Sequence, residues 1–134
     1  MKDSSIKVLL ADDSSLVCDR IESILSDYHQ VEIVGKANSG LEAIKSVVCT
    51  KPDVVVLDIR MPEGNGIHVL ETIKNAHPQT TVIMLTNYPY LQYRKICLDA
   101  GADYFFDKSN EFLEVVEVIK DLIEKHHGNG NESD

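Results

Sequence analysis

The sequence predicts an α/β protein in which a five-stranded parallel sheet is doubly wound by five helices. Three observations support this prediction. Short apolar runs alternate five times with stretches of helical periodicity, the connections are short, and the apolar runs are typical of strands buried on both faces. Polar residues follow the ends of these runs, where ligands bind in open α/β sheets.

The first two strands and their helices are predicted from the N-terminal part of the chain. Residues 6–11 form a continuous apolar run, and the apolar residues between positions 16 and 28 recur at helical spacing. Residues 31–37 are the second strand. Ser39 and Glu42 then form a capping box that begins the second helix.

The middle of the chain repeats the pattern. Pro52 ends the second helix, and residues 53–57 are the third and most apolar strand. After a loop over residues 59–65, apolar residues between positions 67 and 73 predict the third helix. Residues 81–85 are the fourth strand.

The last two units follow in the same way. Pro89 suits the first turn of the fourth helix, and Gly101 is typical of the position just after a helix. The expected face of this helix has a spacing of three residues and consists of Leu91, Arg94 and Cys97. Residues 103–107 are the fifth strand, and residues 112–123 carry the clearest helical period in the chain.

Composition limits the function. The 134 residues suit one domain, which we place at residues 1–126, with a disordered polar tail over residues 127–134. Neither a membrane span nor a signal peptide is recognisable, so a cytoplasmic location is expected. The net charge of −9 predicts no direct nucleic-acid partner. Cys18, Cys49 and Cys97 are expected to be buried, reduced thiols.

Three carboxylates lie at two strand ends. Asp12 and Asp13 follow the first strand, and Asp58 follows the third. If these strands are neighbours, the acids repel by about 4 kcal/mol for each pair 4 Å apart at an effective dielectric of 20. Such a cluster favours a hard divalent cation, namely Mg²⁺ or Mn²⁺. The alternative for Asp13 is a helix N-cap.

A hydroxyl and an ammonium follow two further strands. Thr86 ends the fourth strand and is able to donate to a phosphoryl oxygen, whereas Lys108 follows the fifth and offers a long cationic side chain. Alone, each residue has an ordinary structural explanation. Together with the acids, they predict a crevice for a metal ion and a phosphoryl group.

At residues 6–126 the sequence resembles a response-regulator receiver domain of two-component signalling. The motifs are LLADDS at the acidic pair, VVVLDIRMPEGNG around Asp58, MLT ending at Thr86 and GADYFFDKS around Lys108. The resemblance implies the flavodoxin-like strand order 2-1-3-4-5, which is the order found in this family. Pro62 and Gly66 match the loop after the acceptor.

The resemblance also implies a role for each site residue. Asp58 would be the phosphoacceptor, forming 4-aspartylphosphate, and Mg²⁺ would be held by Asp12, Asp13 and Asp58 with the backbone carbonyl of Arg60. Thr86 and Lys108 would contact the phosphoryl group. The resemblance makes Phe105 the switch aromatic, for which the alternative is simple core packing.

The implied function is a phosphorylation-activated switch that is not an enzyme beyond its own phosphorylation and autodephosphorylation. The donor would be a sensor histidine kinase or a histidine phosphotransfer protein. Phosphorylation would change the surface formed by the fourth helix, fifth strand and fifth helix, which a downstream protein reads. The chain would be a monomer or a phosphorylation-dependent dimer.

Two residues depart from the family pattern. Asn87 stands where the family usually has a small residue after Thr86, and it narrows access to the acceptor together with the flanking Tyr88 and Arg60. Ser109 replaces the usual proline after Lys108, so a trans peptide is expected there.

Two other function classes compete with the switch. A metal-dependent phosphohydrolase also uses a strand-end Asp nucleophile, but typically has a second acid two residues later, where this chain has Arg60. A degenerate receiver would bind partners without phosphorylation, which the intact set of five polar residues disfavours. The absence of GxGxxG after the first strand argues against a dinucleotide-binding protein.

Overall fold

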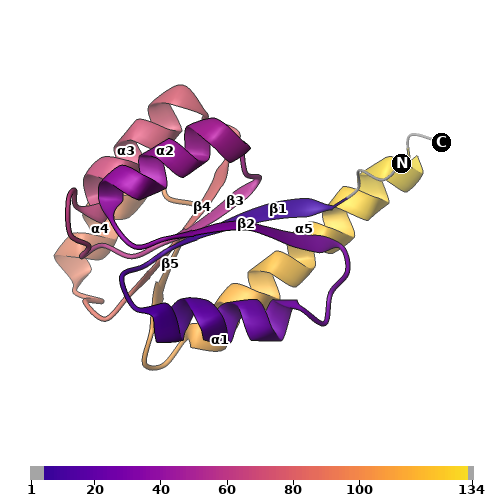
Figure 1. Ribbon diagram of the computed structural model, residues 1–134, viewed down its shortest axis with the longest axis horizontal. Helices are drawn as coiled ribbons and strands as arrows, with labels where there is room; N and C mark the ends of the chain where they lie inside the picture. Colours follow the sequence, from indigo (N-terminus) through magenta and orange to yellow (C-terminus); the bar gives the residue numbers. More distant parts are fainter. Residues whose placement is uncertain (1–4, 133–134) are drawn as a thin grey trace.

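All five strands join one parallel sheet with the order β2-β1-β3-β4-β5 (Figure 1). The computed structural model describes residues 5–132, and the side chains of residues 5–126. The strands are β1 (Ile6–Ala11), β2 (Val31–Ala37), β3 (Val54–Leu57), β4 (Thr81–Thr86) and β5 (Tyr104–Asp107). The fold class and the strand order expected from the sequence are therefore confirmed.

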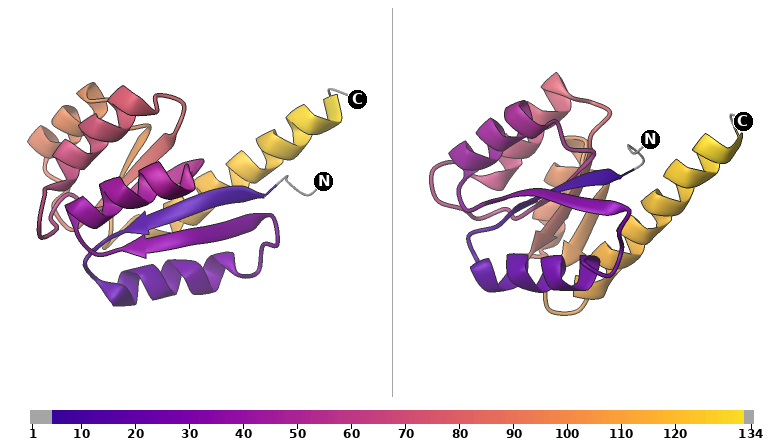
Figure 2. Two further views of the ribbon diagram at one scale, coloured as in Figure 1. Left: turned by 45° about the horizontal axis from the view of Figure 1, so that its top comes forward. Right: turned by 45° about the vertical axis from the view of Figure 1, so that its right-hand side comes forward.

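The helices form one layer on each face of the sheet (Figures 1 and 2). Helices α1 (Ser15–Leu25) and α5 (Phe112–Glu132) cover one face. The opposite face is covered by α2 (Gly40–Thr50), α3 (Gly66–Ala76) and α4 (Leu91–Asp99). Among the residues that the structure describes, no helix is both long and apolar enough to cross a bilayer.

Burial on both faces explains the unbroken apolar runs of the central strands. In β1, Val8 and Leu10 pack in the core beneath α1 and α5, whereas Leu9 packs in the core beneath α2, α3 and α4. The alternation in β3 is the same, with Val56 on the first side and Val55 on the second. These strands are positioned from both sides, so the residues that follow them are also fixed.

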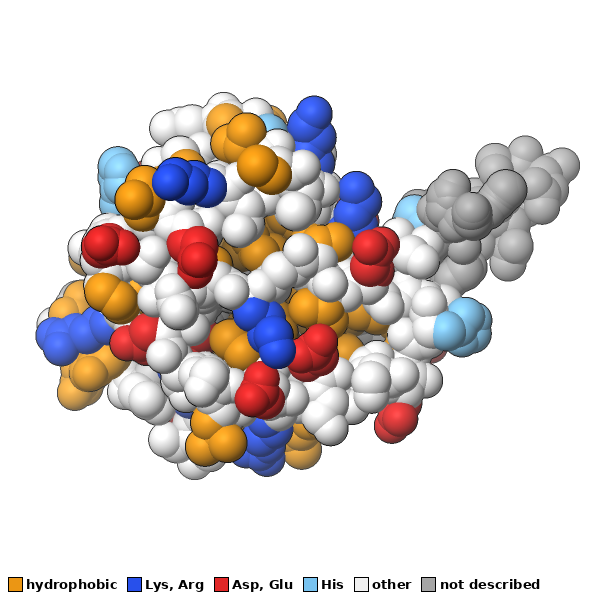
Figure 3. All heavy atoms as spheres, in the orientation of Figure 1, with side chains coloured by type: hydrophobic (Ala, Val, Ile, Leu, Met, Phe, Trp, Pro, Cys, Tyr) orange, Lys and Arg blue, Asp and Glu red, His pale blue; other side chains and the backbone are white. Residues whose placement is uncertain are grey.

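Helix α4 differs from the sequence prediction. Pro89 precedes the helix, which begins at Leu91 after the N-cap Tyr90. Of the face expected from the spacing of three residues, Leu91 is 80% exposed and Arg94 is also exposed, so that Cys97 alone is buried. Figure 3 shows hydrophobic side chains gathered on the surface over this helix. A short helix with several exposed apolar residues has no clear period from which to read its buried face.

Smaller predictions have mixed outcomes. Cys18 and Cys97 are buried free thiols, but Cys49 is exposed because it lies on the outer side of α2. The described residues contain no cis peptide bond, so Lys108–Ser109 is trans as expected. Helix α5 continues to Glu132, past the expected domain boundary at residue 126. The side chains of residues 127–132, and residues 133–134 entirely, lie outside the described part, and the disordered tail stays a prediction.

The loop between β3 and α3 packs closely against its surroundings. The Gly66 amide donates to the Ile59 carbonyl at 2.7 Å, and a Cβ atom at Gly66 would overlap the backbone carbonyl of Asp58. At the other side of the loop, the amides of Gly40 and Leu41 donate to the carbonyls of Pro62 and Glu63 at 3.0 and 2.9 Å. This loop is thereby held together at its two ends and fixed to the start of α2 in its middle.

We expect Gly66→Ala to lower the free energy of unfolding by about 2 kcal/mol, since the added methyl group must displace the Asp58 backbone. Urea unfolding followed by circular dichroism measures this loss. Gly35→Ala is the matched control, because its Cβ would meet only the flexible end of the Leu9 side chain at 3.1 Å. Equal effects of the two substitutions would contradict the close approach at Gly66.

Candidate functional site

The carboxyl ends of β1, β3, β4 and β5 bring the five predicted polar residues to one edge of the sheet. Asp12 follows β1, Asp58 follows β3, Thr86 ends β4 and Lys108 comes after β5. Strands β1 and β3 are direct neighbours, which aligns Ala11 with Leu57 and so places the following aspartates side by side. The sequence analysis therefore predicted correctly that these residues lie together at the carboxyl ends of the strands.

The three acids form one cluster. Asp12, Asp13 and Asp58 each offer a carboxylate oxygen, and these oxygens lie within 4.8 Å of one another. Asp13 is exposed, whereas the other two are buried. Ser14, not Asp13, is the N-cap of α1, because its hydroxyl accepts from the Val17 amide at 3.3 Å. The alternative explanation of Asp13 as the helix cap is therefore wrong, and its carboxylate is available to a ligand.

Lys108 joins the two buried acids. Its Nζ lies 2.8 Å from Asp12 Oδ2 and 3.2 Å from Asp58 Oδ2. The side chains of Lys108, Asp12 and Asp58 are 9%, 7% and 6% exposed, so this contact is screened little by water. The ammonium compensates much of the repulsion between the two carboxylates.

Asp58 carries the clearest sign of an incomplete site. Its Oδ1 is the one buried side-chain oxygen or nitrogen without a hydrogen-bond partner in the described part of the chain. Buried polar atoms are normally paired. Since Lys108 binds Oδ2, Oδ1 is the oxygen that is available to a metal ion or to phosphorus.

Burial and charge shift the protonation of this pair. Burial, together with the neighbouring Asp12 charge, raises the pKa of Asp58, although Lys108 opposes the shift. Burial alone would lower the pKa of Lys108, but its hydrogen bond with Asp12 and the charges of both acids outweigh burial and raise it. Lys108 is therefore a permanent cation at neutral pH.

Cys18 lies beside the acids without competing for a cation. Its thiol donates to the Asp12 carbonyl at 3.8 Å. Burial, assisted by the Asp12 charge, raises the pKa of Cys18 to about 11. A neutral thiol is a poor metal ligand, so the groups at this edge that are suited to hold a cation are all oxygens.

Thr86 and Tyr88 shape the floor and rim of the crevice. Thr86 is fully buried, and its Oγ1 accepts from the Tyr88 amide at 3.0 Å, which leaves the hydroxyl hydrogen free to donate. The guanidinium carbon of Arg60 lies 4.4 Å from the centre of the Tyr88 ring, within the range of a cation–π contact. This pair connects the loops that follow β3 and β4, and Asn87 lies exposed beside it.

Phe105 is buried in the core beneath α2, α3 and α4, and is 4% exposed. Arg94 of α4 holds it from outside, since Nη1 donates to the Phe105 carbonyl at 3.2 Å and the guanidinium carbon lies 5.8 Å from the ring centre. The sequence prediction missed this role for Arg94 because it placed the residue on the buried face of α4. The Arg60–Tyr88 contact was also missed, although both residues were expected to flank the site.

The raised pKa of Asp58 makes the stability of the fold depend on pH. Because the folded state raises the pKa of Asp58, the folded protein binds this proton more tightly than the unfolded chain. The contribution of Asp58 to stability is therefore most favourable below its ordinary pKa of 3.8 and falls as the pH rises through the folded pKa. At neutral pH, without a cation, the ionised carboxylate destabilises the fold.

We accordingly expect Asp58→Asn to raise the free energy of unfolding at pH 7 by about 1 kcal/mol in the absence of Mg²⁺. The gain should shrink as the pH approaches 4. Urea unfolding between pH 4 and 8 measures it, with the exposed Asp27→Asn as the control. An Asp58→Asn variant that is less stable than the wild type at pH 7 would contradict the conclusion that the ionised Asp58 carboxylate destabilises the fold.

Known proteins resemble the chain over most of its length. It matches the family described as response regulator receiver domain over residues 8–120. It is 32% identical over 117 residues to the DNA-binding transcriptional activator DevR/DosR of Mycobacterium tuberculosis, a match that covers 87% of this chain and 54% of that protein. The chain spans about half the length of the curated relatives it matches.

Solved structures show the same architecture. The response regulator domain of Thermotoga maritima CheB has a TM-score of 0.79 at 31% identity, covering 91% of this chain and 96% of that chain. A chain in the CheX–CheY–BeF₃–Mg²⁺ complex of Borrelia burgdorferi has a TM-score of 0.79 at 28% identity, with coverage of 87% and 88%.

One prediction about partners is wrong. The net charge of −9 led us to exclude nucleic acid, but relatives of this chain include transcriptional regulators, and DevR/DosR is named for DNA binding. The matched region is about half of each such protein. The charge of that half is therefore no guide to what the proteins bind.

Proposed function

The chain belongs to the response regulator receiver domain family, and on that premise we propose that it is a signalling switch whose Asp58 accepts a phosphoryl group. Receiver domains act as phosphoacceptors rather than as enzymes on a separate substrate. The observation that carries the assignment to Asp58 is its buried, unpartnered Oδ1 beside two further acids and a lysine. A carboxylate oxygen in this setting is a suitable nucleophile toward phosphorus.

The donor set fits Mg²⁺ or Mn²⁺. Asp12, Asp13 and Asp58 supply clustered carboxylate oxygens, and we add the Arg60 backbone carbonyl from the family pattern. A bound cation would neutralise the charge that develops on the phosphoryl oxygens. Asp13 is exposed, which suits a carboxylate at the point where a hydrated ion enters.

Lys108 and Thr86 act on the phosphoryl group itself. As Asp58 forms its bond to phosphorus and the donor's bond breaks, the negative charge on Asp58 moves to the phosphoryl oxygens. The ammonium on the flexible Lys108 side chain neutralises this charge on the phosphoryl oxygens, and Thr86 donates its free hydroxyl hydrogen to one of them. In-line phosphoryl transfer depends mainly on such positioning and charge neutralisation. Water later hydrolyses the acyl phosphate and resets the switch.

Phosphorylation is read through Thr86 and Phe105. When Thr86 turns toward the phosphoryl group, it gives up the hydrogen bond with Tyr88 and opens space beside Phe105. Arg94 transmits the change to α4, because it contacts both the ring and the carbonyl of Phe105. The altered surface of α4, β5 and α5 is the output of the switch.

The partners follow from this chemistry. A histidine kinase or a histidine phosphotransfer protein supplies the phosphoryl group in the cytoplasm. The output includes transcriptional control through DNA, as the names of the relatives indicate for those proteins. Phosphorylation-dependent dimerisation is a further part of the proposal.

Incubation with acetyl phosphate and Mg²⁺, followed by intact mass analysis, tests the acceptor. We expect one phosphoryl adduct on the wild type, which is lost in Asp58→Ala. Omission of Mg²⁺, or the Asp13→Asn substitution, should slow its formation. Turnover of general phosphomonoesters would instead support a hydrolase, and the absence of an adduct with any donor would support a degenerate receiver.

The rim residues should control how long the adduct lasts. We expect Asn87→Ala and Arg60→Ala each to shorten the phosphoryl lifetime about threefold, equivalent to a barrier change of ~0.7 kcal/mol, because both widen the path of water to Asp58. Loss of the adduct over time, followed by mass analysis, gives the rate. Gln92→Ala, an exposed change on α4, is the control. Lifetimes indistinguishable from the wild type would remove this role.

A further inference from the structure

Tyr88 is held at the rim of the crevice by two contacts. Its backbone amide donates to Thr86 Oγ1 at 3.0 Å, and its ring centre lies 4.4 Å from the guanidinium carbon of Arg60. Both contacts come from residues beside the acceptor. Thr86 ends β4, and Arg60 follows Asp58 by two residues, which span at most about 7 Å of chain. Both anchors of Tyr88 are therefore within reach of a phosphoryl group on Asp58.

A phosphoryl group competes for both of these anchors. Its oxygens are strong acceptors that carry up to about two negative charges, and a guanidinium binds them through paired, charge-assisted hydrogen bonds. The contact of the exposed Arg60 with the Tyr88 ring is weaker than such a pair. Thr86 has a single hydroxyl, and its rotation toward a phosphoryl oxygen removes the acceptor of the Tyr88 amide. One chemical event thus breaks both contacts.

Two further tyrosines connect Tyr88 with α4. The ring centres of Tyr88 and Tyr90 lie 6.5 Å apart, and those of Tyr90 and Tyr93 lie 6.0 Å apart. The ring planes are tilted by 50° and 42°, and tilted rings at such distances attract one another. These three residues, the tyrosine run, extend from the rim of the crevice into the first turn of α4, where Tyr93 packs against the core.

The start of α4 depends on these ring contacts because it lacks a cap. In the described part of the chain, the N-cap Tyr90 makes no capping hydrogen bond, and the first turn of α4 contains no acidic residue. By contrast, the N-caps of α1, α2 and α3 all accept from backbone amides; they are Ser14, Ser39 and Asn65. A helix start without a cap is less stable, so this turn is easily loosened.

We propose that the tyrosine run is a second path from the phosphoacceptor to α4. The phosphoryl group draws Arg60 and Thr86 away from Tyr88, the run loses its anchors, and the uncapped first turn of α4 loosens. The exposed Leu91 in that turn then offers a changed surface to a partner. This inference rests on the proposed phosphorylation of Asp58 and adds a route that does not pass through the buried core aromatic.

Fluorine NMR of the chain labelled with 3-fluorotyrosine tests the movement of the rings, with BeF₃⁻ and Mg²⁺ in place of the phosphoryl group. The chain has five tyrosines, and Tyr→Phe substitutions assign their signals. We expect BeF₃⁻ and Mg²⁺ to move the signals of the tyrosine run. The signal of Tyr28, which packs beneath α1 and α5, should stay. Arg60→Gln should displace the Tyr88 signal beforehand and reduce its further movement.

Hydrogen exchange at α4 tests the loosening of the helix. The Arg94 amide donates to the Tyr90 carbonyl at 3.0 Å across the first turn, so its exchange rate reports the opening of that turn. BeF₃⁻ with Mg²⁺ should speed this exchange. Arg60→Gln alone should speed it about threefold, as expected for loss of an exposed cation–π contact. In a Tyr88→Ala background, Arg60→Gln should have no further effect. Tyr88→Phe keeps the ring and should exchange like the wild type.

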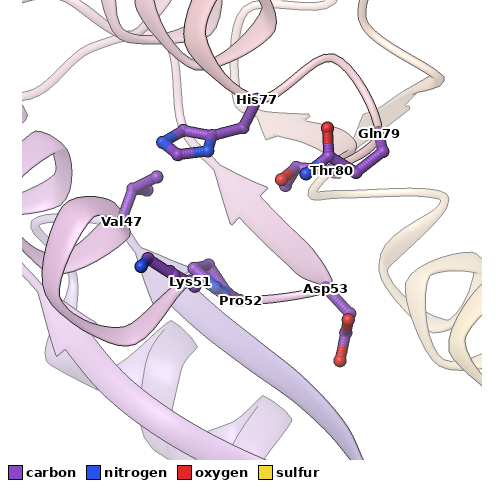
Figure 4. Close-up of a pocket in the computed structure, with 7 residues that line it drawn as sticks. All are labelled: Val47, Lys51, Pro52, Asp53, His77, Gln79 and Thr80. Carbon is purple, nitrogen blue, oxygen red and sulfur yellow. The ribbon is translucent and has the colours of Figure 1, made fainter.

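Two control variants separate this path from general effects. Arg20→Gln removes a contact of the same kind at another place, since the guanidinium carbon of Arg20 lies 4.2 Å from the centre of the Phe112 ring. Gln79→Ala changes an exposed residue at a cavity beside the starts of β3 and β4, at the end of the sheet opposite the carboxylate cluster (Figure 4). Neither control should alter the exchange rate of the Arg94 amide.

The outcomes distinguish this inference from the proposed function. If BeF₃⁻ and Mg²⁺ leave the amides of Asp58 and Thr86 unchanged, the phosphoacceptor assignment fails, and this inference fails with it. If those amides move but the signals of the tyrosine run do not, only the second path is overturned. Equal movement of the Tyr88 signal in the wild type and in Arg60→Gln would also overturn it.

Discussion

A single buried ammonium holds the two buried carboxylates together, and the arrangement of the whole site depends on it. Lys108 reaches from the end of β5 across β4 to Asp58 at the end of β3 and Asp12 at the end of β1. Without it, two like charges would face each other in a poorly solvated crevice. The contact therefore ties three strands together, and any ligand that changes the charge of Asp58 also changes the force on β5.

The site was predictable because its residues are placed by the period of buried strands. A strand buried on both faces allows no slip of register without exposing apolar residues, so Asp12, Asp58 and Thr86 have fixed positions once the apolar runs are recognised. The order of the strands came from the resemblance, since apolar runs alone do not say which strands are neighbours. The capping box at Ser39 was also correct, because it depends on local chemistry.

Contacts made by long side chains from loops and from α4 were not predictable in this way. Arg94 and Arg60 each contact an aromatic ring from a segment distant in sequence, and no periodicity encodes such a pairing. The buried face of α4 was predicted wrongly for a related reason, since four residues in this helix or directly before it are large, apolar and exposed. The partner prediction failed because net charge describes the matched region and not the proteins in which that region occurs.

The hydrogen bond from Arg94 to the Phe105 carbonyl has a consequence for association between molecules. Strand β5 is at the edge of the sheet, where unpaired backbone groups invite another chain to add a strand. Arg94 donates to the carbonyl of Phe105 at 3.2 Å, and the Glu111 carboxylate accepts from the amide of Asp107 at 3.0 Å. Two side chains thus take the positions that a foreign strand would need. Movement of α4 away from β5 would free one of them, so the contact between Arg94 and Phe105 also protects this edge of the sheet against pairing with another chain.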